Sequence, residues 1–235
     1  MNIRAAIAEL EGIAPVELAD PMDAGRIGLI IEGREEIGRV GCALDATPAV
    51  AEAAARASLD LLVVHHTPLF SPTTTVRGYL ARAVRPLIAG GINLYVLHTN
   101  FDRAPGGINA TLADILGLQN VQALTLGVIG DATLPLSGMV RRLEGGVRIW
   151  GKIDRIEKLA VVGGSGFDPA LLEEAAERGA DAFLSAELRH HVALMSPLPC
   201  IESTHYALEA PGMRALARRM NWEFIDESPR IRYQE

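Results

Sequence analysis

Short apolar runs alternate with helical patterns along the first hundred residues. Runs bounded by glycine, proline or polar residues predict strands, here at positions 27–32, 40–45, 60–65 and 92–98. Apolar residues at helical spacing predict helices at positions 2–10, 47–58 and 79–89. Thr47 is the expected N-cap of the second helix, with Pro48 at its first helical position. This alternation of strand and helix indicates an α/β domain with much parallel pairing.

The second half of the chain restarts the same alternation after a glycine-rich stretch. Glycines punctuate residues 127–154, and we expect the boundary between two domains there, at 1–126 and 127–235. A helix is predicted at 108–116, before this boundary. Beyond it we expect a strand from 158, a helix at 169–178, a strand at 182–185 and a last helix from 213 to 220. Pro211 is the expected first helical position of that last helix.

Composition narrows the class of protein. The chain has 235 residues and is 49% hydrophobic, so it is long and apolar enough to form a globular core. Its net charge is −7, so it lacks the excess of positive charge that is typical of nucleic-acid-binding proteins. No run approaches a membrane span, and no basic-then-apolar leader opens the chain, so we expect a cytoplasmic protein. Cys42 and Cys200 form no CxxC pair, so a metal would be held by imidazole and carboxylate.

Histidines follow two of the predicted strands. His65 and His66 end the strand before Pro68, while His98 and Asp102 follow the next one. Because ligands gather at the carboxyl ends of parallel strands, these side chains are expected at one edge of the sheet. Adjacent strand residues point to opposite faces, so His65 and His66 reach one site only where the strand frays, or serve two neighbouring metals. Core or surface histidines, and a turn or cap role for Asp102, are the alternatives.

Two further polar groups allow a functional and a structural interpretation. His205 and Glu209 are expected in a strand-to-helix turn, within reach of one another; otherwise Glu209 is a helix-dipole carboxylate and His205 an ordinary loop histidine. The turn that holds Gly163, Gly164, Ser165 and Gly166 follows a strand and precedes a helix. Backbone N–H groups in such a turn can bind a phosphate. Because the turn lacks the spacing of established phosphate motifs, packing in a tight turn is an equally good explanation of its glycines.

Five motifs in series resemble one known family over nearly the whole chain. They are His-His-Thr-Pro-Leu-Phe at 65–70, His-Thr-Asn-Phe-Asp at 98–102, Val-Val-Gly-Gly-Ser-Gly at 161–166, Gly-Ala-Asp-Ala-Phe-Leu-Ser-Ala-Glu at 179–187 and His-Tyr-Ala-Leu-Glu at 205–209. In this order they resemble the YbgI-like dinuclear-metal family, also called GTP cyclohydrolase 1 type 2 homologue or NIF-three-like. The resemblance implies two similar α/β halves with mixed sheets that share a central cleft.

The resemblance also implies a site. It makes His65, His66, Asp102, His205 and Glu209 the ligands of two divalent metal ions, of which Zn, Fe, Mn, Co and Ni all suit this donor set. It places His98 beside the metals or the substrate and makes it, with Glu187, a candidate proton carrier. His190 and His191 match a polar stretch of the family and are equally consistent with a helix surface.

The family pattern leaves two functions open. One is a metal-dependent hydrolase resembling GTP cyclohydrolase 1 type 2, acting on a small molecule such as a nucleotide. The other is a non-enzymatic metal-binding regulator or scaffold. Relatives assemble as a toroidal homohexamer of dimers, and we expect the same here. The chain departs from the family at Met22-Asp23-Ala24-Gly25, where relatives often have a Trp-Asp-Asn segment, and its middle region is compact.

Overall fold

The computed structural model describes residues 1–229, which form two compact units. One comprises Met1–Gly107 with Met213–Ser228, and the other consists mainly of Ile108–Gly212. The chain therefore divides earlier than the expected position 126/127, because α5 (Ile108–Leu116) packs on the strands of the second unit. It divides again inside α9 (His205–Met220), after which β11 (Glu223–Phe224) joins the first unit's sheet.

The first unit contains a mixed five-stranded sheet in the order β1-β4-β3-β2-β11. Its strands are β1 (Gly28–Ile31), β2 (Val40–Asp45), β3 (Leu61–His66), β4 (Asn93–Val96) and β11. Strands β11, β2, β3 and β4 pair in parallel, while β1 pairs antiparallel with β4. Strand β3 is the middle strand, and its first five residues are buried. Its last residue, His66, is partly exposed at the carboxyl end of the strand.

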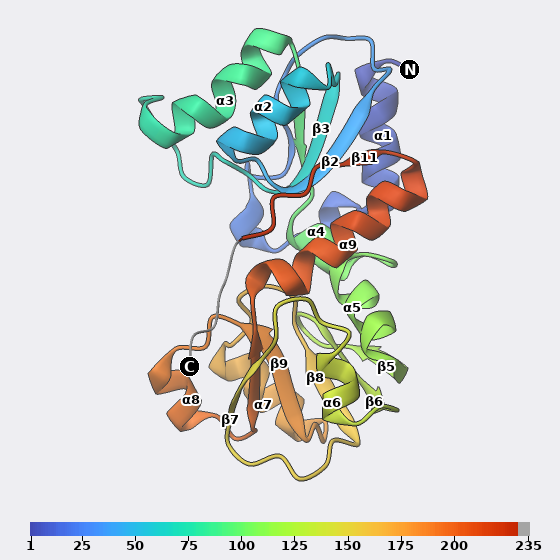
Figure 1. Cartoon of the computed structure of the whole chain (residues 1–235), viewed down its shortest axis with the longest axis vertical. Helices are drawn as coiled ribbons and strands as arrows, with labels where there is room; N and C mark the ends of the chain where they lie inside the picture. The colour runs from blue at the N-terminus through green and yellow to red at the C-terminus, as the bar shows by residue number, and fades with distance from the viewer. Residues whose placement is uncertain (230–235) are drawn as a thin grey trace. The chain divides into compact units, whose positions relative to one another are not determined.

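Helices cover the two faces of this sheet. α2 (Pro48–Arg56) and α3 (Gly78–Gly90) pack together on one face, where Val50, Ala54 and Leu87 meet the apolar side chains of β2, β3 and β4. α1 (Ile3–Ile13) lies on the other side of these strands (Figure 1). Thr47 caps α2 by accepting a hydrogen bond from the Val50 N–H at 3.1 Å, and Pro48 follows it as predicted. Two short 3-10 helices, η1 (Val16–Leu18) and η2 (Pro21–Asp23), lead to β1.

The second unit contains a mixed six-stranded sheet in the order β5-β6-β8-β9-β10-β7. Its strands are β5 (Leu118–Ala123), β6 (Val128–Ala132), β7 (Arg148–Trp150), β8 (Lys158–Val161), β9 (Ala182–Ala186) and β10 (Cys200–Ser203). Its helices, besides α5, are α6 (Leu136–Val140), α7 (Pro169–Glu177) and α8 (His190–Met195). Leu172 and Val192 of α7 and α8 pack on Phe183 of β9.

The two units repeat one topology, which confirms the predicted fold class of two similar α/β halves with mixed sheets. In each, three consecutive strands pair in parallel, and the strand that precedes them in the chain closes one edge antiparallel: β1-β4-β3-β2 in the first unit matches β7-β10-β9-β8 in the second. Each first crossover helix begins with a polar N-cap followed by proline, at Thr47-Pro48 and Asp168-Pro169. Within residues 1–229, no helix is long and apolar enough to cross a membrane.

Two local predictions need correction. The last helix begins at His205 and not beyond Pro211, because the Thr204 side chain caps it by accepting from the Ala207 N–H at 3.1 Å. Pro211 lies inside the helix, where its missing N–H leaves the turn without one backbone bond. A short helix absent from the prediction, α4 (Thr99–Arg103), begins three residues after the end of β4.

In both units, the residue directly before the middle strand is an aspartate whose carboxylate binds backbone N–H groups. Asp60 Oδ2 accepts from the backbone N–H of Gly38 at 2.9 Å and of Arg39 at 2.8 Å, and Arg34 donates to its other oxygen at 2.8 Å. Asp181 Oδ2 accepts in the same way from the N–H groups of Glu157 and Lys158, at 2.8 and 2.9 Å. Burial raises the pKa of the Asp60 carboxyl, but the three hydrogen bonds to its charged form outweigh this and leave the pKa lowered.

This geometry makes a pH-dependent prediction for Asp60→Asn. A lowered folded-state pKa stabilises the fold above the unfolded-state pKa of about 3.9, and that stabilisation is lost as the pH falls through the folded value. We expect Asp60→Asn to cost about 1–3 kcal/mol of unfolding free energy at pH 7, and the difference from wild type to shrink between pH 5 and pH 3. Denaturant unfolding followed by circular dichroism measures this, with the exposed Glu36→Gln as the control. An equal loss at every pH would contradict the account.

Candidate metal centre

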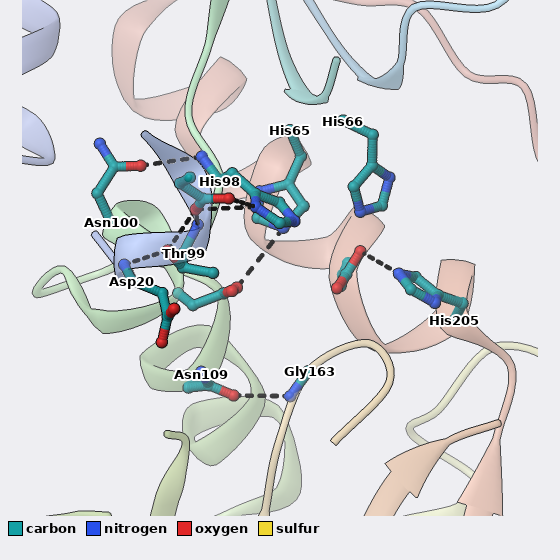
Figure 2. Close-up of polar contacts among 12 residues, drawn as sticks. Asp20, His65, His66, His98, Thr99, Asn100, Asn109, Gly163 and His205 are labelled. Atoms are coloured by element: carbon teal, nitrogen blue, oxygen red, sulfur yellow. Dashed lines mark hydrogen bonds and ion pairs between the residues drawn. The ribbon is translucent and has the colours of Figure 1, made fainter. Parts of the chain in front are cut away.

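Three histidines converge where β3 and β4 end in the first unit. His65 is fully buried, and its ring centroid lies 4.8 Å from that of His66 and 5.0 Å from that of His98. One ring nitrogen of each lies within 4.8 Å of the others. Figure 2 shows His65 and His98 side by side, with His66 next to them. Adjacent residues of β3 reach the same place because His66 is the last residue of the strand, where the alternation of faces need no longer hold.

Helix α4 brings Asp102 back to these histidines. His98 stands at the N-cap position of α4, and its carbonyl oxygen accepts from the N–H groups of Phe101 at 2.7 Å and Asp102 at 3.1 Å. This single turn directs the Asp102 carboxylate toward His65, with Oδ1 3.6 Å from His65 Nε2. Asp102 is only 7% exposed. The structure therefore brings together all four residues of the first unit that the sequence singled out.

Two carboxylates that the sequence did not indicate hold the more exposed histidines. His66 Nδ1 lies 2.7 Å from Asp45 Oδ1, and His98 Nδ1 lies 2.8 Å from Asp23 Oδ1. An ionised carboxylate can only accept, so each imidazole donates from Nδ1, which leaves Nε2 as the nitrogen that can bind a metal. Asp45 could have been found, since it ends β2, the parallel neighbour of β3. Asp23 could not, because it comes from η2, outside the sheet.

Asp23 is a buried anion next to the cluster of His65, His66 and His98. It is fully buried and accepts further hydrogen bonds from the N–H of Thr99 at 3.1 Å and from the Thr99 hydroxyl. Burial raises the pKa of its carboxyl, but the hydrogen bonds from His98 and Thr99 outweigh this, and the pKa is lowered. Asp23 therefore remains charged at neutral pH and keeps His98 in one tautomer.

The second unit places a histidine and two carboxylates at the equivalent strand end. His205 begins α9 directly after β10, and its Nε2 lies 2.9 Å from Oε2 of Glu209, one turn later in the helix. Its Nδ1 lies 2.9 Å from Glu187 Oε1. Glu209 is 3% exposed, whereas the Glu187 side chain is 59% exposed. Both ring nitrogens face carboxylates, and a divalent cation bound between Nε2 and the Glu209 carboxylate would satisfy these two buried atoms.

The glycine turn after β8 makes room for this pair. A Cβ on Gly164, whose φ is +65°, would lie 2.1 Å from Glu209 Oε1 and 3.1 Å from His205 Nε2. The N–H of Gly163 is used by Asn109 Oδ1 at 2.8 Å (Figure 2), and that of Gly166 by Ser185 Oγ at 2.8 Å. These contacts favour the packing interpretation of the turn. Phosphate binding by Gly163, Gly164, Ser165 and Gly166 stays a prediction.

The remaining predicted residues lie at the surface. His190 and His191 are exposed on α8, where the His190 ring packs edge-on against Trp150 at 6.1 Å. Glu187 uses one oxygen on His205, so its geometry is that of a residue that orients an imidazole. A proton-carrying role for Glu187 stays a prediction.

The donor set of each unit fits divalent first-row metals. Imidazole nitrogens and carboxylate oxygens are the ligands that Zn, Mn, Fe, Co and Ni share. Metal-binding histidines usually have the second ring nitrogen hydrogen-bonded to a carboxylate or carbonyl, which is the arrangement of His66, His98 and His205. His65, His66 and Asp102 of the first unit, and His205 and Glu209 of the second, are the residues that would hold such ions.

Comparison with known proteins identifies the family. Residues 1–231 match the family described as Duf34/NIF3 (NGG1p interacting factor 3). The chain belongs to the DUF34/NIF3 family. This membership agrees with the resemblance inferred from the five sequence motifs.

Relatives and solved structures of the DUF34/NIF3 family cover nearly the whole chain. A Streptomyces coelicolor protein named GTP cyclohydrolase 1 type 2 homolog is 33% identical over 235 aligned positions, covering 87% of this chain and 80% of the relative. Reduced HcgD from Methanocaldococcus jannaschii aligns with a TM-score of 0.84 at 27% identity, over 95% and 96% of the two chains. TTHA1606 from Thermus thermophilus aligns with a TM-score of 0.84 at 28% identity, over 98% and 100%.

The carboxylate behind His66 generates a prediction for metal affinity. Asp45→Ala removes the acceptor that fixes the His66 tautomer, and we expect divalent metal binding to weaken about 10- to 100-fold. Competition with a chromophoric zinc chelator measures the affinity, and nitrogen NMR of the metal-free protein reports the tautomer. Glu52→Ala, an exposed carboxylate on α2 of the same unit, is the control. Equal affinities of the two variants would show that Asp45 does not support a metal ligand.

Proposed function

We propose that this DUF34/NIF3 protein is a metal-dependent hydrolase that uses two divalent cations. The observation that carries the proposal is the cluster of His65, His66 and His98, whose ring nitrogens lie within 4.8 Å of one another in the first unit. His98 is proposed to lie beside the metals. The five proposed ligands of one pair of metals, an assignment that rests on the family resemblance, are His65, His66, Asp102, His205 and Glu209. The resemblance is also the basis for proposing a toroidal homohexamer. A cytoplasmic location is proposed because the chain has only two cysteines, Cys42 and Cys200, which suits a reducing compartment.

A hydrolytic role follows from what such a site supplies. Two bound cations would provide a nucleophilic water at neutral pH and stabilise negative charge that develops on the attacked group. In the chain itself, Asp23 holds His98 by Nδ1, so that Nε2 is available to accept a proton from water or return it to a leaving group. Glu187 orients His205 in the same way. His98 is therefore the proposed proton carrier, and Glu187 is proposed chiefly as a positioning residue.

The substrate class is proposed from the names of relatives. Several are called GTP cyclohydrolase 1 type 2 homolog, so we propose a small phosphorylated molecule, with opening of the GTP purine ring as one candidate reaction. The alternative function, a metal-binding regulator or scaffold, predicts metal binding without turnover.

A metal-reconstitution screen tests the proposal. The metal-free protein is loaded with Mn, Fe, Zn or Co and assayed against GTP and a panel of phosphorylated compounds. We expect turnover in at least one metallated form, and His66→Ala to lose at least about 100-fold in metal affinity and turnover, since removing a ligand should cost no less than removing its support. His191→Ala, an exposed histidine of α8, is the matched control.

Two outcomes decide against hydrolysis. Full turnover by a His66→Ala protein that no longer takes up metal would show that the metals are not part of the reaction. Metal uptake without turnover of any substrate in any metallated form would favour the regulator or scaffold.

A further inference from the structure

A small pocket of the first unit adjoins two of the clustered histidines. It is lined by Asp23, Arg26, His66, Thr67, Phe70 and His98. Its volume of about 20 Å³ holds roughly one water-sized group. A larger ligand can therefore place only an end group there, with the rest outside, beside Phe70, which is 52% exposed.

Of the two charged side chains at this pocket other than the histidines, Asp23 has hydrogen-bond partners and Arg26 has no carboxylate partner within residues 1–229. Asp23 is buried and is used by His98 and Thr99. Arg26 lies with its guanidinium carbon 4.4 Å from the centre of the Phe70 ring, a cation–π contact. Within residues 1–229, no carboxylate lies within 4.0 Å of the Arg26 guanidinium. Arg26 is thus a cation at the pocket without a counter-charge from the described chain, in a protein whose net charge is −7.

The Arg26 guanidinium has its N–H donors available. Within residues 1–229, none of its five N–H groups donates a hydrogen bond to the protein. The backbone N–H of Arg26 is bound to the Asp23 carbonyl at 2.8 Å, which fixes the start of the side chain beside the pocket. The Thr67 hydroxyl accepts from the Leu69 N–H at 3.1 Å and so keeps its own proton for a ligand. The pocket therefore offers donors that suit an oxyanion.

We propose that Arg26, positioned by Phe70, recognises the anionic group, phosphate or carboxylate, of the ligand that this site takes. The inference deepens the proposed function and rests on it in one respect: with divalent cations at His66, an additional positive charge nearby is tolerated best when an anionic ligand is present. Arg26 directly follows the segment in which this chain departs from the family pattern.

Calorimetric titration of the full-length protein with inorganic phosphate, and separately with acetate, tests the inference. Both metal-free and metal-loaded protein are used, and the metal content of every variant is measured. We expect phosphate or acetate to bind, and Arg26→Ala to weaken binding about 10- to 100-fold through loss of a charge-assisted pair of hydrogen bonds. Arg26→Lys should fall between wild type and Arg26→Ala, because it keeps the charge but not the planar fork.

Two further variants separate recognition from packing. Phe70→Leu should weaken anion binding severalfold, because the guanidinium loses the ring that holds it. Arg85→Ala removes one exposed positive charge from α3 of the same unit, away from the pocket, and should leave anion affinity unchanged. The inference is overturned if neither anion binds in either metal state. It is also overturned if Arg26→Ala matches Arg85→Ala in anion affinity, whatever its effect on thermal stability.

The metal measurements separate failure of this inference from failure of the proposed function. Intact metal loading with anion binding independent of Arg26 overturns the role of Arg26 alone. Absence of metal uptake, with phosphate or acetate binding that still depends on Arg26, overturns the metal-dependent hydrolase and leaves the anion site standing.

Discussion

A carboxylate on Nδ1 of a strand-end histidine is the interaction on which this site depends. It occurs at His66, His98 and His205, each with a different carboxylate and from a different part of the chain. A free imidazole exchanges between two tautomers and turns about its side-chain torsions. The hydrogen bond fixes both the tautomer and the ring orientation, so that Nε2 of each ring is held in place as a potential metal ligand. The proposed metal binding and proton transfer would both depend on this preorganisation.

The two units reach this arrangement by the same route. In the first, Val64 pairs with Val96, and His98 follows two residues later; in the second, Ala186 pairs with Ser203, and His205 follows two residues later. A carboxylate stands four residues beyond each of these histidines, at Asp102 and Glu209. On the middle strand, the residue that follows the paired position differs between the units. It is His65 after Val64 of β3, and Glu187 after Ala186 of β9. One topology thus supplies different donors from equivalent positions.

Sequence reasoning reached the strands and the ligand candidates because both leave local signals. A buried apolar run that ends in histidine marks the carboxyl end of a strand, and parallel pairing brings such ends together, as the His65–Asp102 contact illustrates. Asp23 was missed because its contact with His98 spans 75 residues and comes from outside the sheet. Asp45 was overlooked although it ends the parallel neighbour of β3, the position from which it meets His66. The start of α9 was misplaced because Pro211 is a strong local signal, overridden here by the Thr204 cap.

The glycine turn after β8 shows a further limit of reasoning from sequence. Its pattern is compatible with phosphate binding, and only the space that a Cβ on Gly164 would take from Glu209 and His205 indicates why glycine is present.

The most direct test of the central claim is an anomalous diffraction map of the protein crystallised with Zn or Mn. The account predicts two peaks about 3.5–4 Å apart, coordinated by His65, His66, Asp102, His205 and Glu209. Absence of a peak at these side chains, or a single metal bound elsewhere, would contradict it.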